Sequence, residues 1–119
     1  MTPETLTQES ASYLAWLVDW EANLPSRSLR EVVAEPARAA VVSVDVINGF
    51  CHVGPLASDR VKGIIAPITL LMTDAYGMGV RHFVLTQDTH EPDAVEFGSY
   101  PPHCVRGTAE SEAVPEFKA

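Results

Sequence analysis

Two apolar, valine-rich runs separated by a helical pattern constrain the fold of this chain more than any other feature. Residues 39–46 and 80–86 each have the pattern of a buried strand, and apolar positions recur at helical spacing over residues 58–77. A strand, a crossover helix and a second strand form a right-handed βαβ unit with parallel strands. The sequence therefore predicts an α/β fold whose parallel sheet is covered on both faces, with a kink or a disturbed hydrogen-bond ladder in the helix at Pro67. A loop of about twenty residues, 87–107, follows, and loops of that length are usually functional.

The first 38 residues are expected to form an N-terminal helical extension. Their apolar positions predict an amphipathic helix that ends near residues 23–25, followed by a short helix from Ser28 to residue 34. Trp16 and Trp20 lie on one stripe of the first helix. Such a stripe favours packing in a core, and a partner-binding surface is the alternative.

Charge and composition narrow the class of protein. A net charge of −8 with only eight Lys and Arg predicts that the chain does not bind nucleic acid. No apolar run approaches the roughly 20 residues of a membrane span, and the N-terminus does not have the pattern of a secretory signal. A cytoplasmic protein is therefore expected. Cys51 and Cys104 are expected to be reduced, buried thiols, and a nucleophilic role for one of them is the alternative.

Acidic and imidazole side chains gather after the second apolar run. Asp88 and His90 are two residues apart, so both point to one side of an extended segment, and His103 returns from a proline-pinned turn beyond Glu96. Asp45 ends the first run, so it should lie near Asp88 at the carboxyl edge of a parallel sheet. Two histidines and a carboxylate suit a divalent ion such as Zn²⁺, Fe²⁺ or Mn²⁺. The alternative is that both histidines make ordinary hydrogen bonds within a loop.

Three stretches resemble the isochorismatase-like cysteine hydrolases, and within that family the nicotinamidase-type metal-dependent amidases. They are VDVINGF at residues 44–50, TQDTH at 86–90 and YPPHCVRGT at 100–108, in the order of the family's motifs. The resemblance covers residues 40–117 and implies a partial three-layer, Rossmann-like fold of isochorismatase type. Residues 39–119 are accordingly expected to be the incomplete N-terminal portion of the hydrolase domain.

The resemblance also implies a role for each matching residue. Asp45 is similar to the acid of the family's Asp-Lys-Cys triad, which takes the thiol proton and passes it to the leaving amine. Phe50 and Tyr100 match aromatic positions that flank a flat substrate ring, and simple core packing is the alternative for both. The family's metal ligands match Asp88, His90, His103 and, in some members, Glu96.

The implied reaction is the hydrolysis of a small amide, such as nicotinamide to nicotinate and ammonia, through a thioester beside the metal ion. The complete protein is expected to be a homo-oligomer. The triad lysine and cysteine are expected beyond residue 119, because Lys118, Cys51 and Cys104 do not match those positions, so the chain is interpreted as a fragment. Two alternatives stay open: a metal-free isochorismatase-like hydrolase of another small substrate, and a non-catalytic metal-binding or assembly module.

Overall fold

The computed structural model describes residues 2–118 and separates into two compact units, which divide between Val32 and Val33. The first unit holds α1 (Pro3–Ala22) and α2 (Leu29–Val32). Thr2 caps α1 by accepting a hydrogen bond from the N–H of Thr5 over 3.2 Å, and Pro3 occupies the first helical turn, where its missing N–H costs nothing. The predicted first helix is therefore confirmed, and it ends at Ala22.

The second short helix begins with the predicted capping box. The N–H of Ser28 donates to the Glu31 carboxylate over 2.8 Å, and the N–H of Glu31 donates to the Ser28 hydroxyl over 3.3 Å. The helix ends at Val32, before the predicted residue 34.

The prediction that the tryptophan stripe packs in a core is wrong for this unit. Helix α1 buries no residue, and Trp16 and Trp20 are 56% and 50% exposed. Their rings instead stack on each other, with centroids 6.3 Å apart. An apolar stripe is buried only when a second surface lies against it, and the spacing of the stripe does not specify that surface.

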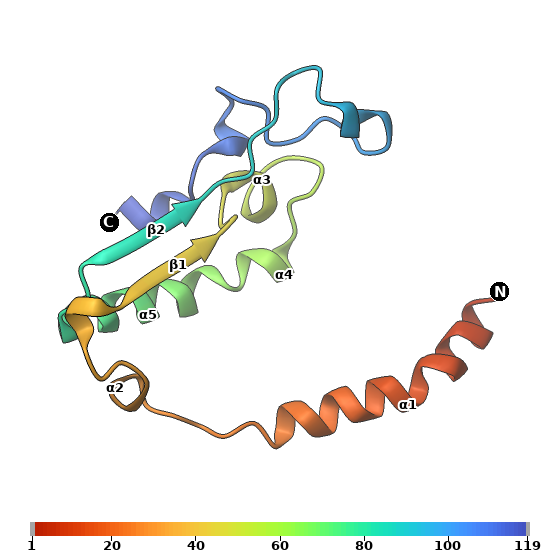
Figure 1. Cartoon of the computed structure of the whole chain (residues 1–119). Coiled ribbons are helices and arrows are strands. Elements are labelled where there is room, and N and C mark those ends of the chain that lie inside the picture. Colours follow the sequence, from red (N-terminus) through yellow and green to blue (C-terminus); the bar gives the residue numbers. More distant parts are fainter. Residues whose placement is uncertain (1, 119) are drawn as a thin grey trace. The chain divides into compact units, whose positions relative to one another are not determined.

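The second unit is built on a parallel pair of strands, as predicted. Strands β1 (Ala40–Val44) and β2 (His82–Thr86) pair in register from Ala40 opposite His82 to Val44 opposite Thr86 (Figure 1). Along the chain, three helices connect the two strands: α3 (Asn48–Cys51), α4 (Asp59–Lys62) and α5 (Ile65–Met78). Single 3₁₀ turns complete the unit at η1 (Pro36–Arg38), η2 (Val95–Gly98), η3 (Ala109–Ser111) and η4 (Pro115–Lys118).

The crossover is two helices where one continuous helix over residues 58–77 was predicted. The helix is interrupted at Gly63 and Ile64, between α4 and α5. Pro67 then falls in the first turn of α5, where an N–H has no partner within the helix, and the predicted disturbance of the helical ladder is the interruption just before it. Gly79 ends α5 with a left-handed φ of 108°, which glycine adopts at no steric cost.

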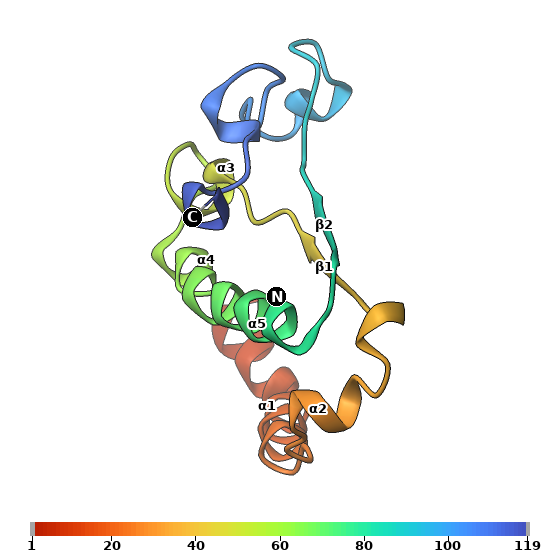
Figure 2. The same ribbon diagram turned by 90° about the vertical axis from the view of Figure 1, so that its left-hand side faces the viewer.

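The crossover helices cover one face of the sheet only, which corrects the prediction that both faces are covered. Figure 2 shows α4 and α5 on the same side of the two strands. Phe83 and Leu85 face α5, since they line a hollow with helix residues such as Met72 and Tyr76. Alternate residues point to the opposite face and are exposed: Val42 at 57%, Val44 at 64% and Val84 at 46%.

A small core lies next to the carboxyl ends of the strands. Its buried residues are Val46, Cys51, Ile65 and Val114, with Val61, Ile68 and Phe117 packed against them. The segment after the long loop returns to this core, because the N–H of Val114 donates to the Val46 carbonyl over 3.3 Å. The core therefore anchors both the segment after β1 and the segment that follows the loop.

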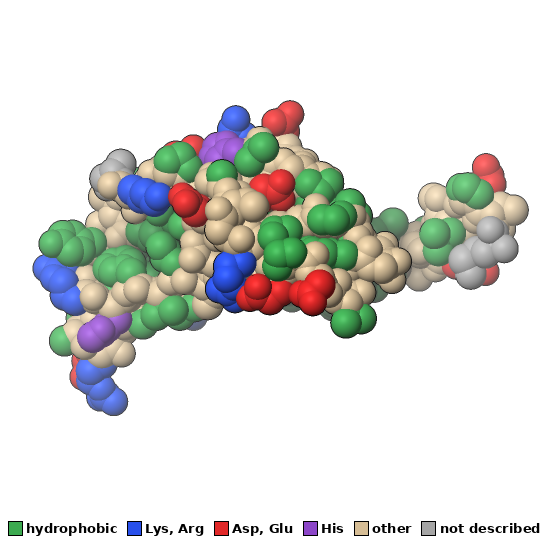
Figure 3. Space-filling view, turned by 90° about the horizontal axis from the view of Figure 1, so that it is seen from above, with side chains coloured by type: hydrophobic (Ala, Val, Ile, Leu, Met, Phe, Trp, Pro, Cys, Tyr) green, Lys and Arg blue, Asp and Glu red, His purple; other side chains and the backbone are tan. Residues whose placement is uncertain are grey.

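The surface is mixed in character. On the face shown in Figure 3, the Lys and Arg side chains stand apart from one another among acidic and hydrophobic groups. Within residues 2–118, no helix combines the length and the apolar character that crossing a membrane requires.

Candidate metal centre

Asp45 and Asp88, which follow the two strands, lie at the same edge of the sheet, as predicted. Asp45 follows β1 and donates its N–H to the carbonyl oxygen of Thr86, the last residue of β2, over 3.1 Å. Asp88 lies two residues beyond Thr86. Asp45 has a left-handed φ of 57°, a conformation that Asp tolerates better than most residues.

Backbone hydrogen bonds close the base of the long loop, where His90, Cys104 and Arg106 form a neck. The N–H of His90 donates to the Cys104 carbonyl over 3.0 Å, and the N–H of Arg106 donates to the His90 carbonyl over 2.8 Å. The Arg106 side chain also reaches the Glu91 carboxylate, at 2.6 Å. These bonds bring His103 beside His90, although the two residues are separated by the whole tip of the loop.

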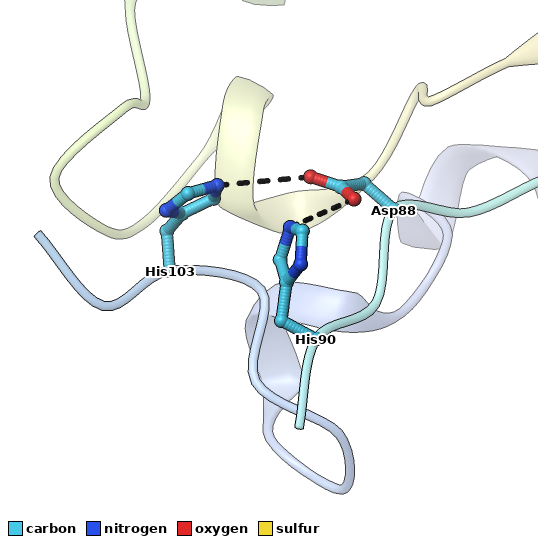
Figure 4. Close-up of side chains that lie close together, drawn as sticks. All are labelled: Asp88, His90 and His103. Carbon is cyan, nitrogen blue, oxygen red and sulfur yellow. Dashed lines mark ion pairs between the residues drawn. The ribbon is translucent and has the colours of Figure 1, made fainter. Parts of the chain in front are cut away.

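Asp88, His90 and His103 form a compact cluster in which the three ligand atoms all lie within 4.8 Å of one another. Nε2 of His90 is 2.9 Å from Oδ1 of Asp88, and Nε2 of His103 is 3.8 Å from Oδ2 (Figure 4). Oε1 of Glu96 lies 2.9 Å from Nε2 of His90 and 3.4 Å from Nε2 of His103. The structure thus brings together all four residues that the sequence predicted as ligands.

The hydrogen bonds of His103 leave one ring nitrogen free for a ligand. Nδ1 lies 2.8 Å from the carbonyl oxygen of Pro101, which can only accept, so Nδ1 carries the proton. The lone pair of a neutral ring is then on Nε2, which faces Asp88 and Glu96. A backbone carbonyl that fixes the tautomer in this way is a common partner of metal-binding histidines.

The surroundings of His90 Nε2 indicate that these residues fit a metal ion. Its Nε2 is buried and, among the described residues, lacks a hydrogen-bond partner, although two carboxylate oxygens lie 2.9 Å away. Neither oxygen meets the geometry of a hydrogen bond. An unsatisfied buried nitrogen is costly in free energy, and a cation bound by the two imidazoles and the carboxylates would satisfy it. The residues present fit a divalent ion.

Aromatic rings surround the two imidazoles, and the sequence identified only some of them. Phe97 makes edge-to-face contacts with both His90 and His103, with ring centroids 5.6 Å apart in each case. Phe50, a predicted substrate residue, has its ring centroid 6.4 Å from that of His103. Phe97 was missed because only the tertiary fold of the loop brings it to the histidines.

A hollow of about 210 Å³ opens beside the cluster. The predicted substrate residue Tyr100 lines it, and so does Leu56, which the sequence did not single out. A larger hollow of about 580 Å³ follows α5, but none of the cluster residues lines it. The smaller one is therefore the space in which a ligand would meet the cluster.

Both cysteines are free and buried, as predicted, and their environment suppresses the thiolate. Burial first, then the negative charge of Asp88 and of further acids, raises the pKa of the Cys104 thiol to about 11. Burial, and then Glu116, raises the pKa of Cys51. A nucleophilic thiol requires the opposite shift, so neither residue is prepared for attack. Lys118 is engaged elsewhere, 3.5 Å from the Glu112 carboxylate.

Comparison with known proteins finds similarity both in sequence and in structure. The chain is 33% identical over 100 residues to Nicotinamidase 1 of Arabidopsis thaliana, which covers 73% of this chain and 37% of that protein. The crystal structure of an isochorismatase-like hydrolase from Alkaliphilus metalliredigens matches with a TM-score of 0.58 and 28% identity, over 65% of this chain and 44% of that one. No protein-family model matches the chain.

Fold and sequence together show that this chain is similar to the isochorismatase-like hydrolases. The similarity extends over part of the chain, and the plant relative confirms the predicted resemblance to the nicotinamidase branch. The matched segment spans less than half of either protein, at 37% and 44% of their lengths.

Proposed function

We propose that this chain carries the metal-binding part of a cysteine amidase. Asp88, His90 and His103 bind one divalent ion, Zn²⁺, Fe²⁺ or Mn²⁺, with Glu96 as a fourth ligand directly or through water. The observation that carries this proposal is the buried, unpartnered Nε2 of His90 at the point where the other ligand atoms converge. A bound ion would supply Lewis-acid chemistry, polarising a heteroatom of the substrate.

The substrate of the complete enzyme is a small amide, such as nicotinamide. The hollow of about 210 Å³ beside the cluster suits a molecule with one small ring. Tyr100 lines that hollow, and the ring of Phe50 lies 6.4 Å from that of His103, which also lines it. Both are proposed to orient a flat substrate so that its carbonyl is held in place for attack.

Asp45 is proposed as the proton carrier. In the family's mechanism a cysteine thiol gives its proton to the acid, and the thiolate attacks the amide carbonyl carbon. The proton then passes to the leaving nitrogen, ammonia departs, and water hydrolyses the thioester. The raised pKa values of Cys51 and Cys104 argue against either of them as that nucleophile.

The direct test is the metal content of purified protein, with the dissociation constant measured for Zn²⁺, Fe²⁺ and Mn²⁺. We expect about one ion per chain in the wild type, and affinity at least tenfold weaker in His90→Ala and His103→Ala, since each removes one ligand. His82→Ala is the matched control, because His82 is exposed at the start of β2. Negligible metal in a wild-type chain shown to be folded would reject the proposal.

A further inference from the structure

The carboxylate of Glu110 holds the peptide unit next to His103. Its Oε2 accepts a hydrogen bond of 3.0 Å from the backbone N–H of Cys104. Cys104 has a left-handed φ of 46°, which residues other than glycine disfavour. Hydrogen bonds to a charged acceptor are stronger than those between neutral groups, so Glu110 can stabilise a conformation that Cys104 would not adopt unaided.

Cys104 in turn connects the two histidines of the candidate metal centre. It follows His103 directly in the chain, and its carbonyl oxygen accepts the N–H of His90 over 3.0 Å. Its side chain is 0% exposed and packs on Gly49, where an added Cβ would lie 2.6 Å from Sγ. A rotation of the Cys104 backbone would therefore change the position of His103 relative to His90.

Glu110 is itself held in one position. Its carboxyl group packs on Gly54, where an added Cβ would lie 2.7 Å from the carboxyl carbon and 2.8 and 2.9 Å from the two oxygens. The side chain of Asn48, in α3, donates to the carbonyl oxygen of Ala109 over 3.0 Å. These contacts fix η3 against the segment after β1, so the carboxylate has little freedom to leave Cys104.

We propose that Glu110 is a positioning residue of the metal centre. It holds Cys104 in the left-handed conformation that directs Nε2 of His103 toward Asp88, and it affects the ion through His103 without ligating it. This inference rests on the proposed function, since it concerns how tightly the same cluster binds an ion. Nothing in the spacing of the sequence motifs indicates this contact, because Glu110 lies beyond the last of them.

The test compares Glu110→Gln with Glu112→Gln. Both changes neutralise one acid in the same segment, but the Glu112 carboxylate is exposed and pairs with Lys118 at 3.5 Å. The Co²⁺ dissociation constant is measured by competition with a chromophoric chelator, and the thermal midpoint of each metal-free variant is measured beside it. We expect Glu110→Gln to weaken Co²⁺ binding by roughly tenfold or more, and Glu112→Gln to stay within about twofold of the wild type.

A merely structural role would lower the thermal midpoint of metal-free Glu110→Gln and leave its Co²⁺ dissociation constant unchanged, and that result overturns the inference. If Glu110→Gln does not fold, amide exchange of the metal-free wild type decides: a protected Cys104 N–H supports the inference, and an unprotected one overturns it. A wild type that binds no Co²⁺ rejects the proposed function instead. The exchange of the Cys104 N–H still tests the contact with Glu110 in that case.

Discussion

Adding one methyl group at Gly49 should destabilise the second unit, because Gly49 lies where α3, Cys104 and η3 meet. The Cβ of Gly49→Ala would lie 2.6 Å from Sγ of Cys104, 3.0 Å from the Glu110 carbonyl oxygen and 3.2 Å from the Glu110 Cβ. Carbon atoms pack at about 3.5–4.0 Å, so the sulfur must move by about 1 Å. Sγ is fully buried and the oxygen belongs to the backbone, so neither can move freely.

Overpacking of this kind costs about 1–3 kcal/mol. For a domain of this size, 1 kcal/mol corresponds to roughly 4–8 °C in the thermal midpoint. We therefore expect Gly49→Ala to lower the midpoint of metal-free protein by roughly 4–24 °C, measured by circular dichroism at 222 nm and checked by urea denaturation.

Gly77→Ala is the matched control for this substitution. Gly77 lies within α5, and an added Cβ there would meet nothing within 4 Å. Alanine should instead stabilise the helix by about 0.5–1 kcal/mol, because glycine loses more backbone entropy on folding. A Gly49→Ala protein as stable as the wild type would refute the close packing of Cys104 on α3. Equal losses at both positions would show that the effect does not depend on the surroundings of Gly49.

Two further predictions follow from the cysteines. The stability of the wild type should fall between pH 9 and 11 more steeply than that of Cys104→Ala, by up to about 2–3 kcal/mol, because the pKa of this thiol rises from 9.0 to about 11 on folding. The unfolded chain then loses the proton first, which favours unfolding as the pH rises, and equal alkaline losses in the two proteins would contradict this. The 119-residue chain supplied with Zn²⁺ or Fe²⁺ should release no ammonia from nicotinamide or simple aliphatic amides, because removing the nucleophile of a triad enzyme costs several orders of magnitude in rate. Turnover that survives both Cys51→Ala and Cys104→Ala would refute the cysteine mechanism, and turnover abolished by one of them would identify that residue as the nucleophile.

The βαβ unit could be predicted because its signals are local. Two valine-rich runs that each end in an aspartate, joined by a helical period, specify parallel strands whose acids share one edge. The break between α4 and α5 was not predictable from the same period, because the apolar spacing continues across Gly63 and Ile64 without interruption. The covering of the sheet was overestimated for a similar reason, since valine content does not specify what lies on the outer face.

The four candidate ligands could be found from residue type and spacing, since imidazoles and carboxylates carry their chemistry in their identity. Phe97, Leu56 and Glu110 could not, because their roles come from position alone. Phe97 contacts both histidines only after the loop has closed, and Glu110 reaches Cys104 only because η3 packs against α3. A phenylalanine, a leucine and a glutamate have no distinguishing spacing in the sequence.

The neck formed by His90, Cys104 and Arg106 divides the cluster into parts that differ in their tolerance of insertions and deletions. His90 and His103 lie at the neck, whereas Glu96 lies in the tip of the loop, next to the highly exposed Val95. Lengthening the tip before Glu96 would displace that carboxylate and leave the histidine pair in place. The loop can therefore gain or lose a negative charge at the candidate metal centre during evolution without rebuilding the imidazole pair.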